Sequence, residues 1–271
     1  MKKQLGKFKS YKDVLDFFPR SIWEINSRTK ELKEIFTDED VDKVSCIRTP
    51  EFKYPVKTKA GFSVFNPRVG INILKIWSNI GDKVIDPFGG RDRALITNYM
   101  DRHYTGYEIS KKTVDNTMKK IINWKHKNKK YNMNIILGDG TTLEKEKENT
   151  FDFCYTCPPY WFKEKYESTQ GQLSDIKNEN EWLDSINRTG KNLKRVMKKD
   201  KYIVIITGDI RYKKKLIPLH SQWIQEFEKN NLFLKDIIIL RTYPITFVGV
   251  NGYLRNRIMQ KSHEYILVFK T

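Results

Sequence analysis

The stretch KVIDPFGGRDRALITNYM, Lys83–Met100, decides the fold. Lys83–Ile85 is short and apolar like a buried strand, the Gly89–Gly90 pair favours a tight turn, and residues 94–100 have the spacing of a helix. A strand that runs through a glycine turn into a helix is the repeating unit of α/β proteins.

The same alternation continues toward the C-terminus. The expected strands are YTGYEIS, ending near Glu108, then MNIILGDG, ending at Asp139, then FDFCYT, KYIVIITGD, KDIIIL and EYILVFK, and the expected helices cover Lys111–Trp124, about Glu181 to Met197, and Trp223–Phe227. This order predicts an α/β fold with a Rossmann-like, doubly wound, mainly parallel sheet. The last strands have no obvious crossover helix between them, so antiparallel pairing is expected there.

The N-terminal part has a different pattern. Residues 1–60 are charged and mostly helical in periodicity, with expected helices at Tyr11–Phe18 and Ser27–Phe36. A buried helix containing Ile71 and Trp77 follows. We therefore expect a short helical N-terminal extension over residues 1–60 and the main domain over residues 61–271.

Composition narrows the class of protein. The chain has 271 residues, with 51 Lys and Arg against 33 Asp and Glu and a net charge of +18. Such a charge favours an acidic polymer, most often nucleic acid, as partner, although an AT-rich genome also enriches lysine. No apolar run is long enough to span a membrane and no signal peptide is recognisable. Three cysteines, an odd number, argue against a disulfide framework and favour the cytoplasm.

Candidate site residues follow the expected strands. In a doubly wound sheet, ligands bind beyond the carboxyl ends of the strands, near the topological switch point. The strand ends carry Asp86-Pro87-Phe88-Gly89-Gly90, then Glu108, then Asp139, then Cys157-Pro158-Pro159-Tyr160. Glycines let the backbone approach a ligand, and an acid about twenty residues further on can bind ribose hydroxyls. Each feature alone is weak, but together they indicate a nucleoside-containing cofactor.

These motifs resemble those of S-adenosylmethionine-dependent DNA amino-methyltransferases, which methylate N4 of cytosine or N6 of adenine. The resemblance is greatest to small methylases of phages and mobile elements, and it runs from about Phe62 to Phe269, as TGDIR (207–211) and SHEYILVF (262–269) also match. It implies the class I methyltransferase fold, S-adenosylmethionine as cofactor and double-stranded DNA as partner. A place in DNA methylation or restriction-modification, in a bacterial or phage-infected cell, is implied as well.

The resemblance also implies roles for individual residues. The catalytic tetrapeptide would be Cys157, Pro158, Pro159 and Tyr160. The cofactor would be bound by the segment Phe65, Asn66 and Pro67, by the loop Asp86, Pro87, Phe88, Gly89 and Gly90, by Glu108 at the ribose, and by Asp139 at the adenine. DNA would be contacted by Trp161, Arg211, Lys213, Arg255, Arg257 and Lys261, with Trp161 equally expected as a packing residue.

The implied mechanism needs rigid acceptors. An exocyclic amine is a poor nucleophile because the ring withdraws its lone pair. The carbonyl between the two prolines and the side chain of Cys157 would accept hydrogen bonds from the amine, and the prolines would hold these acceptors in place. The target base would flip out of the duplex and stack on Tyr160.

Two features depart from the family pattern. Arg91-Asp92-Arg93 follows Gly90 where a further small residue is usual, so Arg91 either pairs with the cofactor carboxylate or leaves a looser loop. Cys157 stands where adenine-specific enzymes carry Asp or Asn and many cytosine-specific enzymes carry Ser. Cysteine is closest to serine in size and is a weak acceptor, which slightly favours N4 of cytosine.

The Cys154-x-x-Cys157 spacing has two other interpretations, a zinc site and a redox pair. A zinc site needs further ligands, but Cys46 is remote in sequence and the histidines show no ligand spacing, so no metal is expected. A redox pair is expected at a helix start, whereas Cys154 lies inside an apolar strand. Cys154 is best interpreted as a small core residue.

The remaining candidates have structural alternatives. Asp209 lines the pocket or caps a turn, and the basic residues near it contact phosphate or form a solvated face. The N-terminal extension is a second DNA-facing element or a packing lid. As alternatives to a DNA methyltransferase, the sequence allows an RNA base N-methyltransferase or a non-catalytic DNA-binding protein that retains the fold.

Overall fold

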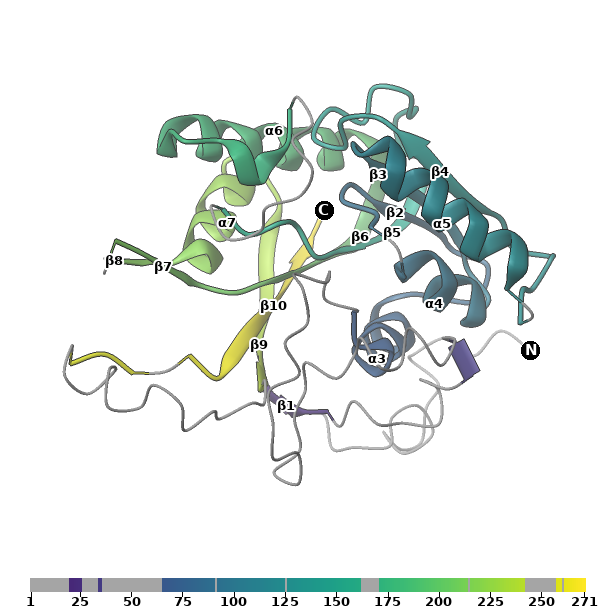
Figure 1. Ribbon diagram of the computed structural model, residues 1–271, viewed down its shortest axis with the longest axis horizontal. Coiled ribbons are helices and arrows are strands. Elements are labelled where there is room, and N and C mark those ends of the chain that lie inside the picture. Colours follow the sequence, from purple (N-terminus) through teal and green to yellow (C-terminus); the bar gives the residue numbers. More distant parts are fainter. Residues whose placement is uncertain are drawn as a thin grey trace.

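The computed structural model describes residues 20–25, 34–35, 65–90, 92–124, 126–161, 171–213, 215–241, 257–259 and 261–271 (Figure 1). The predicted helix Tyr11–Phe18 lies outside these ranges, as does most of the predicted helix Ser27–Phe36. Within the described residues the main sheet has eight strands in the order β1-β9-β10-β6-β5-β2-β3-β4.

The bounds of the elements agree closely with the expected ones. The strands of the main sheet are β1 (Ile22–Glu24), β2 (Lys83–Asp86), β3 (His103–Glu108), β4 (Met133–Leu137), β5 (Phe151–Thr156), β6 (Met197–Thr207), β9 (Phe233–Arg241) and β10 (His263–Lys270). The helices are α3 (Pro67–Trp77), α4 (Arg93–Tyr99), α5 (Lys111–Asn123), α6 (Glu179–Val196) and α7 (Leu219–Glu228), with a short 3₁₀ turn, η4 (Leu173–Asp175). A separate hairpin, β7 (Ile210–Tyr212) and β8 (Lys215–Ile217), was not expected from the sequence.

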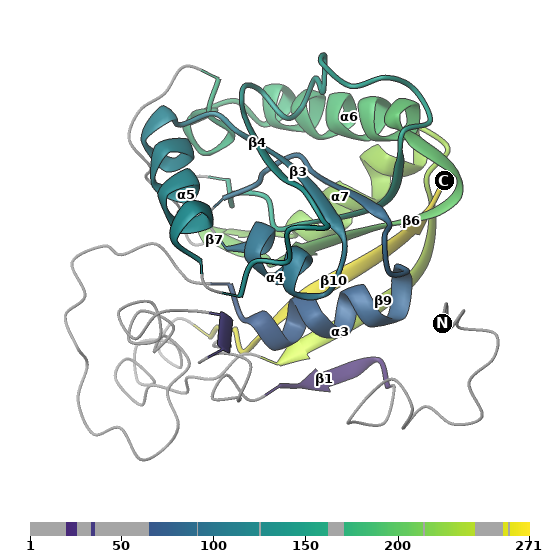
Figure 2. The same cartoon turned by 90° about the vertical axis from the view of Figure 1, so that its right-hand side faces the viewer.

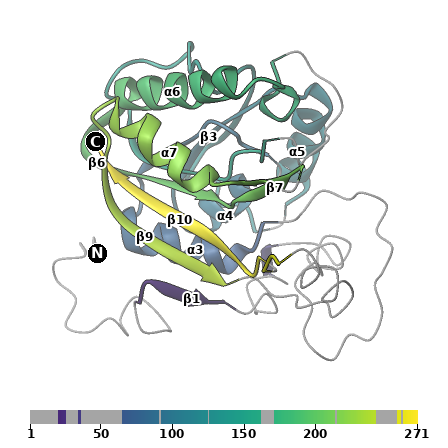
Figure 3. The same cartoon turned by 90° about the vertical axis from the view of Figure 1, so that its left-hand side faces the viewer.

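The predicted doubly wound sheet is confirmed. Strands β4, β3, β2, β5 and β6 are mutually parallel, whereas β10 runs antiparallel to both β6 and β9, which lie on either side of it (Figure 3). From β2 the chain moves outward through β3 and β4 and then returns to β5 on the other side of β2. The topological switch point, where such folds bind ligands, therefore lies between β2 and β5.

Helices cover both faces of this sheet (Figures 1 and 2). On β6, Val204 and Ile206 pack with residues of α3 and α4, while Ile203 and Ile205 pack with residues of α6 and α7. A strand buried on both faces needs apolar side chains at every position. This explains the unbroken β-branched run that made β6 recognisable in the sequence.

One described part of the N-terminal extension is a strand and not a helix. Strand β1 pairs in parallel with β9, and the side chain of Trp23 is only 2% exposed. Its ring stacks on Trp77 of α3 with 6.1 Å between ring centroids. Three residues are too few to show a strand period, so this strand between the two predicted helices was not expected from the sequence, and residues 22–24 belong to the main sheet.

Candidate functional site

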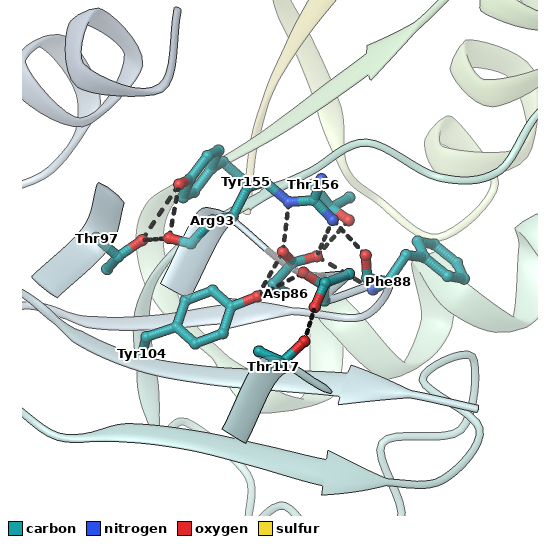
Figure 4. Close-up of polar contacts among 10 residues, drawn as sticks. Asp86, Phe88, Arg93, Thr97, Tyr104, Thr117, Tyr155 and Thr156 are labelled. Atoms are coloured by element: carbon teal, nitrogen blue, oxygen red, sulfur yellow. Dashed lines mark hydrogen bonds and ion pairs between the residues drawn. The ribbon is translucent and has the colours of Figure 1, made fainter. Parts of the chain in front are cut away.

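The centre of the site is the carboxylate of Asp86, at the end of β2 (Figure 4). Asp86 is fully buried and accepts hydrogen bonds from Thr156 Oγ1 at 2.5 Å, Tyr104 Oη at 2.8 Å and the Phe88 amide at 3.1 Å. Thr156 ends β5, the neighbouring strand across the switch point. The carboxylate thus ties together two strands and the turn that follows the first of them.

Arg93 supplies the counter-charge. Its Nε lies 2.6 Å from Asp86 Oδ2, and its guanidinium also donates to the carbonyl oxygen of Phe88. Burial lowers the pKa of Arg93, but the adjacent Asp86 carboxylate outweighs this effect and the net pKa is raised. Burial and the same carboxylate raise the pKa of Tyr104, which therefore stays a neutral donor. This buried ion pair was not foreseen, although Arg93 lies in the segment that departs from the family pattern.

The turn Pro87–Gly90 is held tightly from several sides. The Gly89 amide donates to the carbonyl of Tyr107 at 2.6 Å, and Gly90 has a φ of +55°, which residues with a side chain rarely adopt. A Cβ at Gly140 would lie 1.7 Å from the carbonyl oxygen of Pro87, so only glycine fits there. Gly89 and Gly90 leave their part of the turn without side chains, so the backbone there can approach a ligand.

The two predicted cofactor acids end the next two strands. Glu108 ends β3, and its Oε1 accepts a hydrogen bond from the Ser110 amide at 2.8 Å. Burial raises the pKa of Glu108. Asp139 follows β4, with Oδ1 accepting from the Thr141 amide at 2.8 Å and Oδ2 lying 3.8 Å from Arg188 of α6. Both acids thus lie at the same edge of the sheet as Asp86, as expected.

The upstream segment packs beside the buried ion pair. Asn66 caps α3, with its Oδ1 accepting from the Arg68 amide at 3.0 Å, and Pro67 occupies the first turn. The Arg93 guanidinium lies 5.6 Å from the centroid of the Phe65 ring. Phe65 is therefore adjacent to the Asp86–Arg93 pair, consistent with a position near a ligand at the switch point.

The tetrapeptide Cys157–Tyr160 follows β5 directly. Its first residue, Cys157, is half-buried and comes directly after Thr156, which donates a hydrogen bond to Asp86. The Tyr160 hydroxyl donates to Glu264 Oε1 at 2.6 Å, and the ammonium of Lys261 lies 5.5 Å from the centroid of the Tyr160 ring. Glu264 was not a candidate from the sequence, because it is separated from Tyr160 by about a hundred residues.

Trp161 and Cys154 lie in the core. Trp161 is 4% exposed, stacks on Trp182 with ring centroids 5.8 Å apart, and donates from Nε1 to the Ile176 carbonyl at 2.7 Å. These contacts agree with the packing alternative for Trp161. Cys154 is fully buried, packs on the opposite face of the sheet from Cys157, and forms no disulfide. The strand therefore does not bring the two cysteines of the C-x-x-C spacing together.

Asp209 lies beyond the end of β6. Its Oδ1 is 2.6 Å from Nδ1 of His220, the second residue of α7, and its carbonyl accepts from Lys261 Nζ at 3.0 Å. Arg211, Lys213 and Arg257 are exposed, while Arg255 lies outside the described residues. Lys261 thus lies beside both Asp209 and Tyr160 of the predicted tetrapeptide, and Arg211 follows Asp209 on β7.

The described part of the chain shows neither a metal-binding cluster nor a membrane-spanning helix. No three His, Cys, Asp or Glu side chains gather there in a way that could hold a metal ion. None of the helices described is both long enough and apolar enough to cross a membrane.

Comparison with known proteins finds a family match for the second part of the chain. Residues 151–271 match the family model N6_N4_Mtase, described as DNA methylase. These residues are therefore similar to DNA methylases. The match begins at the first residue of β5 and includes the whole tetrapeptide, Glu264 and Asp209. No curated protein sequence matches the chain.

The fold of the chain is shared with solved methyltransferases. It is similar to an S-adenosylmethionine-dependent methyltransferase from Methanosarcina mazei, with a TM-score of 0.51, 11% identity, and coverage of 73% of this chain and 96% of that one. The geranyl diphosphate C-methyltransferase of Streptomyces coelicolor gives a TM-score of 0.51 at 10% identity, with 76% and 77% coverage. The chain therefore has the class I methyltransferase fold.

A third similar structure is titled as a DNA modification methylase. It is a candidate DNA modification methylase from Thermus thermophilus, solved in complex with S-adenosylmethionine, with 25% identity and a TM-score of 0.37. The alignment covers 48% of this chain and 51% of that protein, so this chain spans about half the length of that methylase.

Proposed function

We propose that this protein is a DNA methylase that transfers a methyl group from S-adenosylmethionine to an exocyclic amine of a base in double-stranded DNA. One observation carries the proposal. The strand that leads into the glycine turn and the strand that leads into the proposed tetrapeptide are joined at their ends by the 2.5 Å hydrogen bond from Thr156 Oγ1 to Asp86 Oδ1. A group bound at the turn after Asp86 would thus lie beside the residues that follow Thr156, which is what direct methyl transfer requires.

The residues at the switch point suit the cofactor. The glycine turn leaves room for the backbone to contact it, and the N-terminus of α4 follows. Glu108 would bind the ribose hydroxyls, Asp139 the adenine amino group, and the segment Phe65–Pro67 the methionine end. When bound, S-adenosylmethionine supplies a methyl group on a sulfonium, an activated donor that needs no further chemistry from the protein.

The tetrapeptide would activate and place the amine. Cys157 and the carbonyl of Pro158 accept hydrogen bonds from the amine, which directs its lone pair toward the methyl group. Pro158 and Pro159 restrict the backbone, so these acceptors need little reorganisation. Transfer would join the amine nitrogen to the methyl carbon and break the bond from that carbon to sulfur, and the proton that the nitrogen loses would pass to water.

The base itself would be held by Tyr160 after flipping out of the duplex. Glu264 fixes the tyrosine hydroxyl, and Lys261 lies over the ring, close to where the sugar-phosphate chain of a flipped nucleotide would run. Arg257 and Lys261 would contact phosphates. Because Cys157 resembles serine in size and accepts weakly, N4 of cytosine is the proposed target, ahead of N6 of adenine.

An in vitro methyl-transfer assay tests this proposal. The purified protein is incubated with S-adenosylmethionine labelled in its methyl group and with duplex DNA or RNA, and the digested nucleosides are identified by mass spectrometry. Label in N4-methylcytosine of DNA is expected. Label in N6-methyladenine would overturn the choice of base, label in RNA alone would overturn the choice of polymer, and no label at all would overturn the proposed activity.

A further inference from the structure

The hairpin β7–β8 stands apart from the main sheet. It leaves the carboxyl end of β6 and returns directly into α7, and its cross-strand pairs are Ile210–Ile217, Arg211–Leu216 and Tyr212–Lys215. In Figure 1 it extends past α7 on the left of the molecule. A two-stranded ribbon outside the main sheet buries little apolar surface of its own, so it is at best marginally stable without further contacts.

The root of the hairpin is firmly anchored. Its first pair, Ile210 and Ile217, is 6% and 9% exposed. Just outside this pair, Asp209 Oδ1 lies 2.6 Å from His220 Nδ1 and so connects the two ends of the hairpin. Asp209 Oδ2 also lies 3.4 Å from the hydroxyl of Tyr265 on β10. The hairpin therefore has a defined direction relative to the sheet.

The root also adjoins the catalytic tetrapeptide. A Cβ at Gly208, the residue before Asp209, would lie 3.3 Å from the hydroxyl of Tyr160. Lys261 connects the two, because it lies over the Tyr160 ring and donates to the carbonyl of Asp209. Whatever polymer presents its base to Tyr160 must therefore pass close to the hairpin.

The rest of the hairpin is exposed and basic. Residues 210–217 contain four basic residues and no acidic ones. Arg211, Lys213 and Lys215 are exposed, as are 40% of Tyr212 and 48% of Leu216. A cleft of about 950 Å³, lined by Tyr212, Lys215, Asp175, Glu179 and Gln225 among others, separates one side of the hairpin from α6 and α7. The exposed residues of the hairpin can thus reach a partner.

We propose that this hairpin enters the major groove of the duplex beside the flipped base, with Arg211, Lys213 and Lys215 on phosphates and Tyr212 and Leu216 against base edges. The inference rests on the proposed DNA methylation. The major groove, about 12 Å wide, admits a two-stranded β-ribbon, whereas the minor groove, about 6 Å wide, is too narrow for one. The hairpin would hold the duplex and read bases close to the target.

Salt-dependent binding tests the phosphate contacts. The triple variant Arg211→Gln/Lys213→Gln/Lys215→Gln is compared with Lys83→Gln/Lys199→Gln/Lys235→Gln, which removes the same charge from exposed residues at the opposite edge of the sheet, near the starts of β2, β6 and β9. Affinity for a random-sequence duplex is measured by fluorescence anisotropy at several salt concentrations. Since each phosphate contact contributes about 0.9 to the slope of log K against log salt, we expect the slope to fall by roughly 2 to 3 in the hairpin variant and by less than about 1 in the control. An equal fall in both variants, or none in the hairpin variant, would overturn the proposal.

Groove probes test the mode of contact. The wild-type protein should displace methyl green, which occupies the major groove, more effectively than distamycin, which occupies the minor groove, and Tyr212→Ala/Leu216→Ala should lose this preference. Preferential displacement of distamycin would overturn the major-groove placement. Calorimetry with S-adenosylmethionine is run in parallel, and all variants should bind it like the wild type. If the wild-type protein does not methylate DNA, the proposed function is refuted. If the wild-type protein methylates DNA but the hairpin variant has an unchanged salt slope, only the role of the hairpin is refuted.

Discussion

The substitution Asp86→Asn should destabilise the protein strongly, although the side chain keeps almost the same shape. Asparagine keeps an acceptor oxygen near Thr156 and the Phe88 amide, but it leaves the guanidinium of Arg93 without its counter-ion. Asp86 is fully buried and the Arg93 side chain is 8% exposed, so water cannot replace the lost charge. Breaking a buried ion pair from one side typically costs about 3–5 kcal/mol, a large part of the roughly 5–15 kcal/mol that stabilises a domain.

A double-mutant cycle separates the pair from its surroundings. Arg93→Met alone should also be costly, because it leaves the Asp86 carboxylate buried and unpaired. The double variant Asp86→Asn/Arg93→Met should be clearly more stable than the sum of the single effects predicts, since neither charge then remains uncompensated. Asp152→Asn is the matched control, because Asp152 pairs with Lys198 and Lys201, whose side chains are 43% and 31% exposed. Its cost should be about 1 kcal/mol or less.

Urea unfolding followed by circular dichroism measures these effects. With a slope of about 2 kcal/mol per molar urea, a loss of 3–5 kcal/mol moves the midpoint down by roughly 1.5–2.5 M. Strictly additive losses in the double variant, or an Asp86→Asn midpoint equal to that of Asp152→Asn, would refute the view that this ion pair organises the site.

Three further outcomes follow from the same geometry. Tyr160→Ala should abolish methylation while S-adenosylmethionine binding, measured by calorimetry, persists; surviving activity would mean that the base binds elsewhere. Gly140→Ala should weaken cofactor binding because its Cβ meets the Pro87 carbonyl, and an unchanged dissociation constant would contradict this. Burial raises the pKa of Glu108, so the folded state binds its proton more tightly than the unfolded chain, and the contribution of Glu108 to stability falls as pH rises from the usual glutamate range through the raised folded value. Glu108→Gln should therefore flatten the pH dependence of Tm in this pH range. It should also weaken cofactor binding roughly 10-fold or more, because a charge-assisted hydrogen bond is lost. A steeper pH dependence of Tm, or an unchanged affinity for the cofactor, would count against the assignment.

Sequence periodicity predicted the sheet because its strands are buried. Strand β6 is apolar on both faces, and the glycine turn after β2 and the acids after β3 and β4 follow from the order of the elements. Strand β1 and the hairpin β7–β8 were missed, because three-residue strands are too short to show a period. The hairpin is also rich in lysine, which is typical of a loop.

The polar contacts of the site could not be read from sequence. Arg93 pairs with Asp86 only because α4 begins so close to the end of β2 that the guanidinium reaches back into the core. Glu264 meets Tyr160 through the antiparallel return of β10 beside β6. Such partners depend on register and packing, and no local pattern in the chain records them.

The most direct test of the proposed function is nucleoside mass spectrometry of genomic DNA from cells that express the protein, with cells expressing Tyr160→Ala as the control. The account predicts N4-methylcytosine in the first sample and none above background in the second. Finding neither N4-methylcytosine nor N6-methyladenine in DNA, with the RNA of the same cells also unmodified, would contradict it.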